Sequence, residues 1–98
     1  MTYAFIQDVP IDQATYEKVR AGLGDATPKG LISHLVITQE NGLRYIDVWE
    51  TREDWDRFHL DRLQAVVEGV LAEQGITADR SLVRREEIKV IDTWLGVA

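Results

Sequence analysis

The chain contains no cysteine. This absence excludes a disulfide framework, a thiolate nucleophile and an iron–sulfur site. Its two histidines, His34 and His59, are not spaced as metal ligands, and the chain has no His-Glu-x-x-His motif. His59 is expected on the solvated face of a helix. We therefore expect neither a metal ion nor a cofactor.

Positive charge is also scarce, because the chain has 11 basic against 17 acidic residues and a formal net charge of −6. Nucleic acids and anionic membrane surfaces bind proteins through a cationic footprint, so neither is expected as a partner. No apolar run approaches the roughly 20 residues that cross a bilayer. The first residues lack the basic and long apolar segments of a signal peptide, so we expect a cytoplasmic protein.

The length of 98 residues and the 45% hydrophobic content indicate one globular domain over residues 1–98. Two-residue alternation predicts strands at residues 2–8, 31–38, 43–50 and 83–95. Apolar residues at steps of three and four predict helices at residues 12–23 and 51–73. Asp12 and Thr51 are the expected N-caps of these helices. A polar loop precedes the last strand.

The order β-α-β-β-α-β predicts an α+β fold, a ferredoxin-like sandwich with a four-stranded antiparallel sheet and two helices on one face. Asn41-Gly42 marks the hairpin turn between the second and third strands. By alternation, the helix-free face would carry an aromatic set: Tyr3, Phe5, His34, Tyr45, Trp49 and Trp94. That is too much aromatic surface to leave in water, so we expect a homodimer whose two sheets close a barrel.

The most informative stretch is residues 45–60, where a strand with two different faces runs directly into a capped helix. Tyr45, Asp47 and Trp49 lie on one side of this strand. His34 is on the preceding strand, which has two alternating faces. We expect the more uniformly apolar face, which begins at Leu31 and does not include His34, to pack on the helices. His34 then faces the same helix-free side as Asp47, roughly opposite it in the hairpin.

An imidazole, a phenol and a carboxylate on one apolar wall can act as a proton-transfer set. We expect His34 to be the base, Asp47 to orient it, and Tyr45 to hydrogen-bond a developing enolate or phenolate. The expected substrate-binding residues, which line the same cavity between the sheet and the dimer partner, are Phe5, Gln7 and Trp49.

Structural interpretations of the same residues stay open. His34 can be a hydrogen-bonded structural residue or a dimer contact, and a His34 on the helix-covered face would indicate such a role. Tyr45 and Trp49 can simply fill a barrel interior. The inward carboxylate of Asp47 needs a partner, which can be an arginine of the same or the partner chain. The candidates are Arg44, Arg84 and Arg85.

The strand-to-helix junction at residues 48–55 reads Val-Trp-Glu-Thr-Arg-Glu-Asp-Trp. It resembles the Val-Trp-Glu-Ser-x-Glu-Ala-aromatic junction of the antibiotic biosynthesis monooxygenase-like branch of the dimeric α+β barrel superfamily. Residues 30–49 resemble small actinobacterial proteins of this group. The resemblance implies a homodimer, a cavity for a small molecule, and catalysis without flavin or metal.

In the quinone-forming monooxygenases of this family, a tryptophan at the position of Trp49 lines the cavity, with an asparagine four residues earlier. This chain has Tyr45 there. The haem-degrading members use a helix tryptophan and a later histidine, where this chain has Phe58 and Glu68. Haem degradation is therefore not expected. The resemblance thus implies a cofactor-independent oxygenase of an aromatic or polyketide-like substrate. Related cofactor-free cyclases and isomerases use histidine and tyrosine, and a non-enzymatic ligand-binding or structural dimer is the third hypothesis.

Overall fold

The computed structural model describes residues 2–76 and 83–96. The polar loop expected before residue 83 falls mainly on residues 77–82, outside the described residues. In chain order, the elements are β1 (Tyr3–Val9), α1 (Gln13–Leu23), β2 (Leu31–Gln39), β3 (Gly42–Trp49), α2 (Arg52–Phe58), the π-helical turn η1 (His59–Leu63), α3 (Gln64–Glu73) and β4 (Arg84–Ile88). This order confirms the predicted α+β class.

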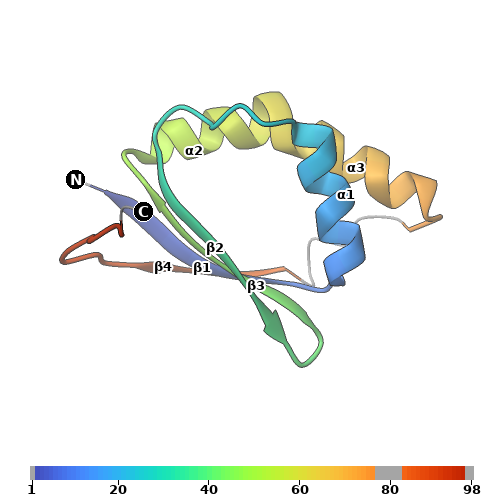
Figure 1. The fold of residues 1–98 in the computed structure, drawn as a ribbon, viewed down its shortest axis with the longest axis horizontal. Coiled ribbons are helices and arrows are strands. Elements are labelled where there is room, and N and C mark those ends of the chain that lie inside the picture. Colours follow the sequence, from blue (N-terminus) through green and yellow to red (C-terminus); the bar gives the residue numbers. More distant parts are fainter. Residues whose placement is uncertain (1, 77–82, 97–98) are drawn as a thin grey trace.

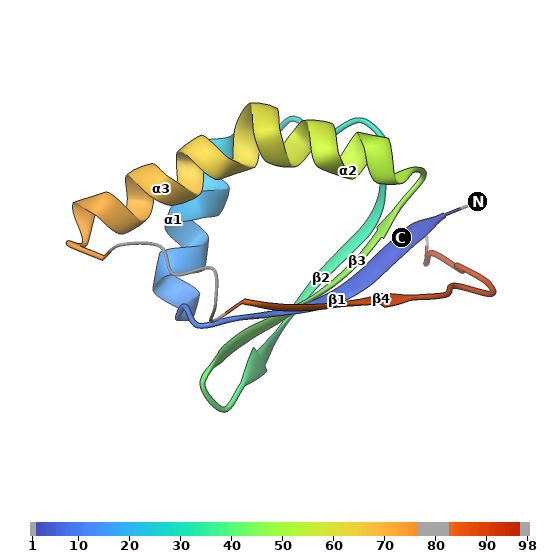
Figure 2. The same ribbon diagram turned by 180° about the vertical axis from the view of Figure 1, so that it is seen from behind.

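The four strands form one antiparallel sheet in the order β2-β3-β1-β4. This arrangement is compatible with a ferredoxin-like fold. The helices lie on one side of the sheet, where α2, η1 and α3 run over it as a single arch (Figure 1). Seen from behind, the described helices again lie on that one side, which leaves the opposite face of the sheet without a helix (Figure 2).

Local sequence signals account for where these elements begin. The Asp12 carboxylate accepts a hydrogen bond from the Thr15 amide at 2.8 Å and caps α1 as predicted. The Thr51 hydroxyl accepts from the Asp54 amide at 3.1 Å and caps α2. At the hairpin, Gly42 has a φ of 152°, and a Cβ there would collide with the Val9 carbonyl oxygen. Glycine is therefore required at this end of the predicted turn.

The prediction of which sheet face the helices cover is wrong. Tyr3, Phe5 and Trp49 pack against Trp55 of α2 in the main core cluster. Leu35 lies on the helix-free face instead and is 54% exposed. The large aromatic side chains of the sheet pack closely against those of α2, and this close packing explains why the aromatic face of the sheet is turned towards the helices.

A β-bulge in β2 explains part of this error. Leu31 lies opposite Trp49, whereas Ser33 lies opposite Val48, so one extra residue is inserted between them. Leu31 therefore faces the helices and packs on the core cluster. Strict alternation had placed it with Ser33 and Leu35, and this assignment set the orientation of the whole strand.

The predicted boundaries of two further elements also change. The expected helix over residues 51–73 contains the π-helical turn His59–Leu63, a local change of winding that sequence periodicity does not indicate. The expected strand over residues 83–95 ends at Ile88. Trp94 lies beyond it and is 93% exposed, so it does not belong to the sheet face on which we had placed it.

Candidate active site

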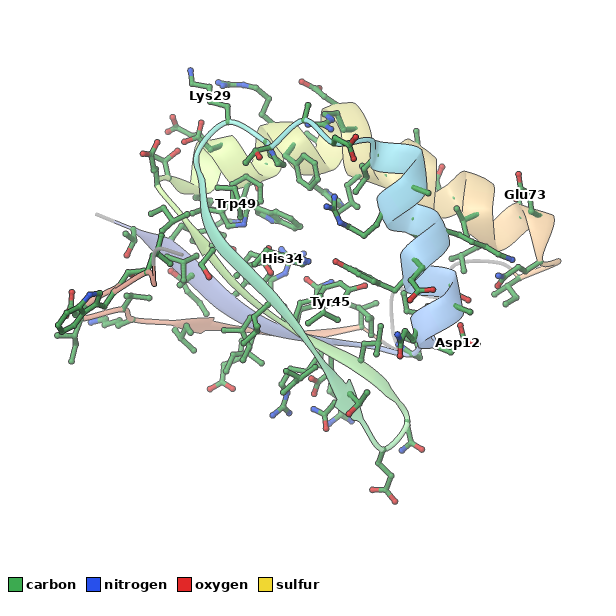
Figure 3. The ribbon with its side chains drawn as sticks, viewed as in Figure 1. Asp12, Lys29, His34, Tyr45, Trp49 and Glu73 are labelled. Carbon is green, nitrogen blue, oxygen red and sulfur yellow. The ribbon has the colours of Figure 1, made fainter. Side chains whose placement is uncertain are left out.

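An open cavity of about 1170 Å³ lies between the sheet and the helices. Typical small-molecule sites are about 300–1,000 Å³, so this space is large enough for a molecule of several rings. Figure 3 shows His34, Tyr45 and Trp49 pointing from the sheet towards this space. The predicted cavity on the helix-free face is therefore replaced by one on the helix-covered face.

Four side chains form a continuous hydrogen-bonded chain in this cavity. Trp49 Nε1 donates to Asp47 Oδ2 at 3.1 Å, and Asp47 Oδ1 lies 2.6 Å from His34 Nδ1. His34 Nε2 lies 2.8 Å from the hydroxyl of Tyr16 on α1. Because a carboxylate only accepts hydrogen bonds, we assign the proton to Nδ1, which leaves Nε2 of a neutral ring to accept from Tyr16.

The β2–β3 register accounts for this geometry. His34 and Asp47 are paired residues on adjacent strands, as the Asn41-Gly42 turn predicts. Asp47 is only 3% exposed, and each of its oxygens has a hydrogen-bond donor. Among the described residues, the ion-pair partner of Asp47 is His34. The alternative of an arginine partner within the same chain is therefore not observed there. The prediction that Asp47 orients His34 is consistent with this contact.

Tyr45 and Tyr16 form a cluster of three neighbouring rings with the His34 imidazole. The Tyr45 ring centroid lies 5.5 Å from that of His34 and 5.6 Å from that of Tyr16. Burial raises the pKa of Tyr45 well above its usual value of 10, and the charges of Tyr16 and Asp47 act in the same direction. Burial also raises the pKa of Tyr16, against the opposing effect of Arg20. Both phenols therefore remain hydrogen-bond donors at neutral pH.

The three predicted substrate-binding residues have different positions. Gln7 and Trp49 line the cavity. Phe5 is buried in the aromatic core beneath it and is not part of the cavity wall among the described residues. Gln7 accepts a hydrogen bond at 2.9 Å from Arg85 Nε on the neighbouring strand β4, and Arg85 also lines the cavity.

Sequence reasoning missed two residues of this site. Tyr16 was not among the expected site residues, and Arg85 was considered as a partner for Asp47 and not as a residue of the cavity wall. Spacing within a helix does not indicate which strand residue its side chains will meet, so no signal identified the Tyr16–His34 contact. The alternation of β4 does place Arg85 on the same face as Gln7, once the strand order is known.

The expectation that His59 lies on a solvated helix face is wrong. Its ring stacks on Trp55 with a centroid distance of 5.4 Å and an angle of 24°. It is half-buried and lines the cavity. His59 opens the π-helical turn, and such turns in helices are frequent at functional sites.

Within residues 2–76 and 83–96, no group of three or more acidic or histidine side chains is arranged to hold a metal ion. A helix long and apolar enough to cross a membrane is also not found in this part of the chain.

Fold and site together define a small α+β protein with a four-stranded antiparallel sheet, helices on one face, and an Asp–His–Tyr chain in the cavity between them. No protein-family model matches the sequence, and no curated protein is significantly similar to it.

Proposed function

We propose that this protein is a cofactor-independent oxygenase that acts on a small aromatic or polyketide-like phenol, as an antibiotic biosynthesis monooxygenase-like member of the dimeric α+β barrel superfamily. The observation that carries the proposal is the hydrogen-bonded chain of Asp47, His34 and Tyr16 beside a large, mainly apolar cavity. The position of His34 on the helix-covered face would by itself indicate a structural role, but a purely structural histidine there would be enclosed by packed side chains, and the His34 side chain is 28% exposed. Here that face is hollow beside the imidazole.

In this proposal, His34 is the base. Its Nε2 accepts the Tyr16 proton as Tyr16 takes a proton from the substrate, so that the hydroxyl relays the transfer over a 2.8 Å contact. The adjacent Asp47 carboxylate stabilises the imidazolium that results. Tyr45 remains protonated and donates a hydrogen bond to the oxygen on which the substrate anion carries its charge.

The substrate anion then reacts with dioxygen. For an activated ring CH₂ group, the overall change is R₂CH₂ + O₂ → R₂C=O + H₂O. The carbon loses four electrons and two hydrogens, and dioxygen gains four electrons to become one carbonyl oxygen and one water. The substrate itself is the reductant, so the balance requires no further cofactor. The apolar wall that includes Trp49 and Trp55 would hold the ring next to the base.

The alternative function is a cofactor-free cyclase or isomerase, in which the same anion reacts within the substrate or takes its proton back at another carbon. The position of Tyr45, whose ring centroid lies 5.5 Å from that of His34, favours this alternative equally, because enolisation also needs a hydrogen-bond donor near the base. A third possibility is a protein that binds a small ligand without converting it.

An assay with dithranol, an anthrone with an acidic ring CH₂ group, separates these functions. Oxygen uptake and anthraquinone formation are measured in air above the spontaneous rate without protein. Exchange of the CH₂ protons is measured by NMR in D₂O under nitrogen. We expect both signals from the wild type and a loss of about 10²–10⁴-fold in His34→Ala, which lacks the base. Thr38→Ala, on the same strand but outside the described cavity wall, is the matched control.

Each result has a definite meaning. Proton exchange without oxygen uptake contradicts the oxygenase and supports the cyclase or isomerase. Binding of dithranol without either signal supports the ligand-binding alternative. Equal rates for His34→Ala and Thr38→Ala show that His34 is not the base.

The proposal includes a cytoplasmic homodimer that joins two helix-free sheet faces. Leu35 and Ile37 are large apolar residues on this face and are 54% and 41% exposed, which supports a second copy as its cover. Sedimentation should give the mass of a monomer for Ile37→Glu. Thr38→Glu, on the other face of the strand, should remain dimeric. A monomeric wild type at high concentration contradicts this part of the proposal.

A further inference from the structure

Arg85 has an unusual position at the β4 side of the cavity. Its guanidinium carbon lies 4.9 Å from the centroid of the Phe5 ring and 5.0 Å from that of Trp55. Its Nε donates to Gln7 Oε1 at 2.9 Å. The aromatic contacts and the amide hold the guanidinium at the cavity wall, in front of the aromatic core.

The terminal nitrogens of this guanidinium have no hydrogen-bond partner among the described residues. Among the residues that the structure describes, Arg85 makes its one side-chain hydrogen bond through Nε, and no acidic side chain there forms an ion pair with it. Arginine presents its remaining donors as a planar fork that matches the two oxygens of a carboxylate. The nearby Gln7 amide fixes the orientation of this fork.

The strand order sets where this cation lies relative to the base. Arg85 pairs with Gln7, and Gln7 pairs with Tyr45, so these three side chains follow one row across the helix-covered face. His34 lies on β2, at the opposite edge of the sheet. Three strand spacings of about 4.8 Å separate β4 from β2, or about 14 Å. A ligand that reaches both groups must therefore extend across the sheet.

We infer that Arg85, oriented by Gln7, recognises a carboxylate or a similar planar oxyanion at the end of the substrate remote from the reacting group. The inference rests on the proposed function, which places the reacting phenol or enol at His34. It narrows the substrate class to an elongated aromatic acid of two or more rings. The two tryptophans of the wall contact its rings, and Arg85 determines which end enters first.

A pair of probes tests this inference by binding alone. 6-Hydroxy-2-naphthoate carries a phenol at one end and a carboxylate at the other, and 6-hydroxy-2-naphthamide replaces the carboxylate with a neutral amide. Calorimetry should show the naphthoate binding the wild type at least about 10-fold more tightly, the usual effect of a hydrogen-bonded charge. This comparison requires no variant.

Variants then assign the preference to one residue. In Arg85→Gln the two probes should bind equally, and Arg85→Lys, which keeps the charge but not the fork, should retain part of the preference. Arg84→Gln is the matched control, because Arg84 is the preceding residue on β4 and points to the other face. A preference that survives Arg85→Gln, or that is lost equally in Arg84→Gln, overturns the inference.

Together with the dithranol assay, the binding experiment distinguishes this inference from the proposed function. Equal binding of both probes to the wild type overturns the role of Arg85 but leaves an aromatic-binding cavity. A preference for the naphthoate in a protein that neither exchanges protons nor consumes oxygen retains the role of Arg85 and contradicts the enzyme. If neither probe binds, the aromatic ligand site on which both depend is contradicted.

Discussion

His34 and Asp47 face each other across two adjacent strands, with Nδ1 and Oδ1 2.6 Å apart. The second carboxylate oxygen accepts a hydrogen bond from the Trp49 indole. The carboxylate is thus held from two directions in a buried position, and it determines which nitrogen of His34 faces the cavity. This relationship links the stability of the sheet to the chemistry that we propose.

Asp47→Ala should destabilise the protein, because it leaves the buried indole N–H of Trp49 without its acceptor. We expect a loss of about 1–3 kcal/mol in the free energy of unfolding, measured by urea denaturation. Asp56→Ala, which removes an exposed carboxylate 3.7 Å from Arg52, should change it by less than about 0.5 kcal/mol. Equal stability of the two variants would show that the Asp47 contacts contribute little.

The tautomer of His34 provides a direct test of the hydrogen-bonded chain. Nitrogen-15 NMR of the neutral ring should show the proton on Nδ1 in the wild type and in Tyr16→Phe, since Asp47 is retained in both. Asp47→Asn should weaken this preference, because an amide can present either a donor or an acceptor to the ring. A proton on Nε2 in the wild type would contradict the direction of transfer that we propose.

The tyrosines predict a loss of stability at alkaline pH. Because burial raises the pKa of Tyr45 above 10, the folded protein holds this proton more tightly than the unfolded chain does. The stabilising contribution is complete below pH 10 and is lost as the pH rises above it. Absorbance at 295 nm should show delayed ionisation of Tyr45 and Tyr16, whose pKa is also raised. Tyr45→Phe should lose less stability between pH 10 and pH 12 than the wild type does.

Arg62 should contribute to stability by attaching the loop after α1 to the π-helical turn. It donates to the carbonyl oxygens of Leu23 at 2.9 Å and Ala26 at 3.3 Å, and it lies over the Phe58 ring at 5.4 Å. Arg62→Met should therefore cost about 1–3 kcal/mol. The comparison is Arg57→Met, a more exposed arginine on α2 whose partner Asp54 is 3.8 Å away, for which we expect under about 1 kcal/mol. If thermal and urea denaturation give the same stability for the two variants, the contacts of Arg62 do not contribute to stability.

The sequence by itself determined the order of elements and much of the local geometry. The caps at Asp12 and Thr51 and the Asn41-Gly42 turn depend on residues close together in the chain, so their patterns can be read directly. The same turn sets the register that brings His34 opposite Asp47. This pairing was predicted because a hairpin with a short turn has few registers.

Only the tertiary structure decided which face of the sheet the helices cover. Both faces of β3 are apolar enough to be buried, and the choice depends on the fit of Trp55 and Trp49 against Phe5, which is far from both in the chain. The bulge after Leu31 and the contact of Tyr16 with His34 likewise arise from packing between elements. Periodicity describes each element alone, and it does not specify which side chains of two elements will meet.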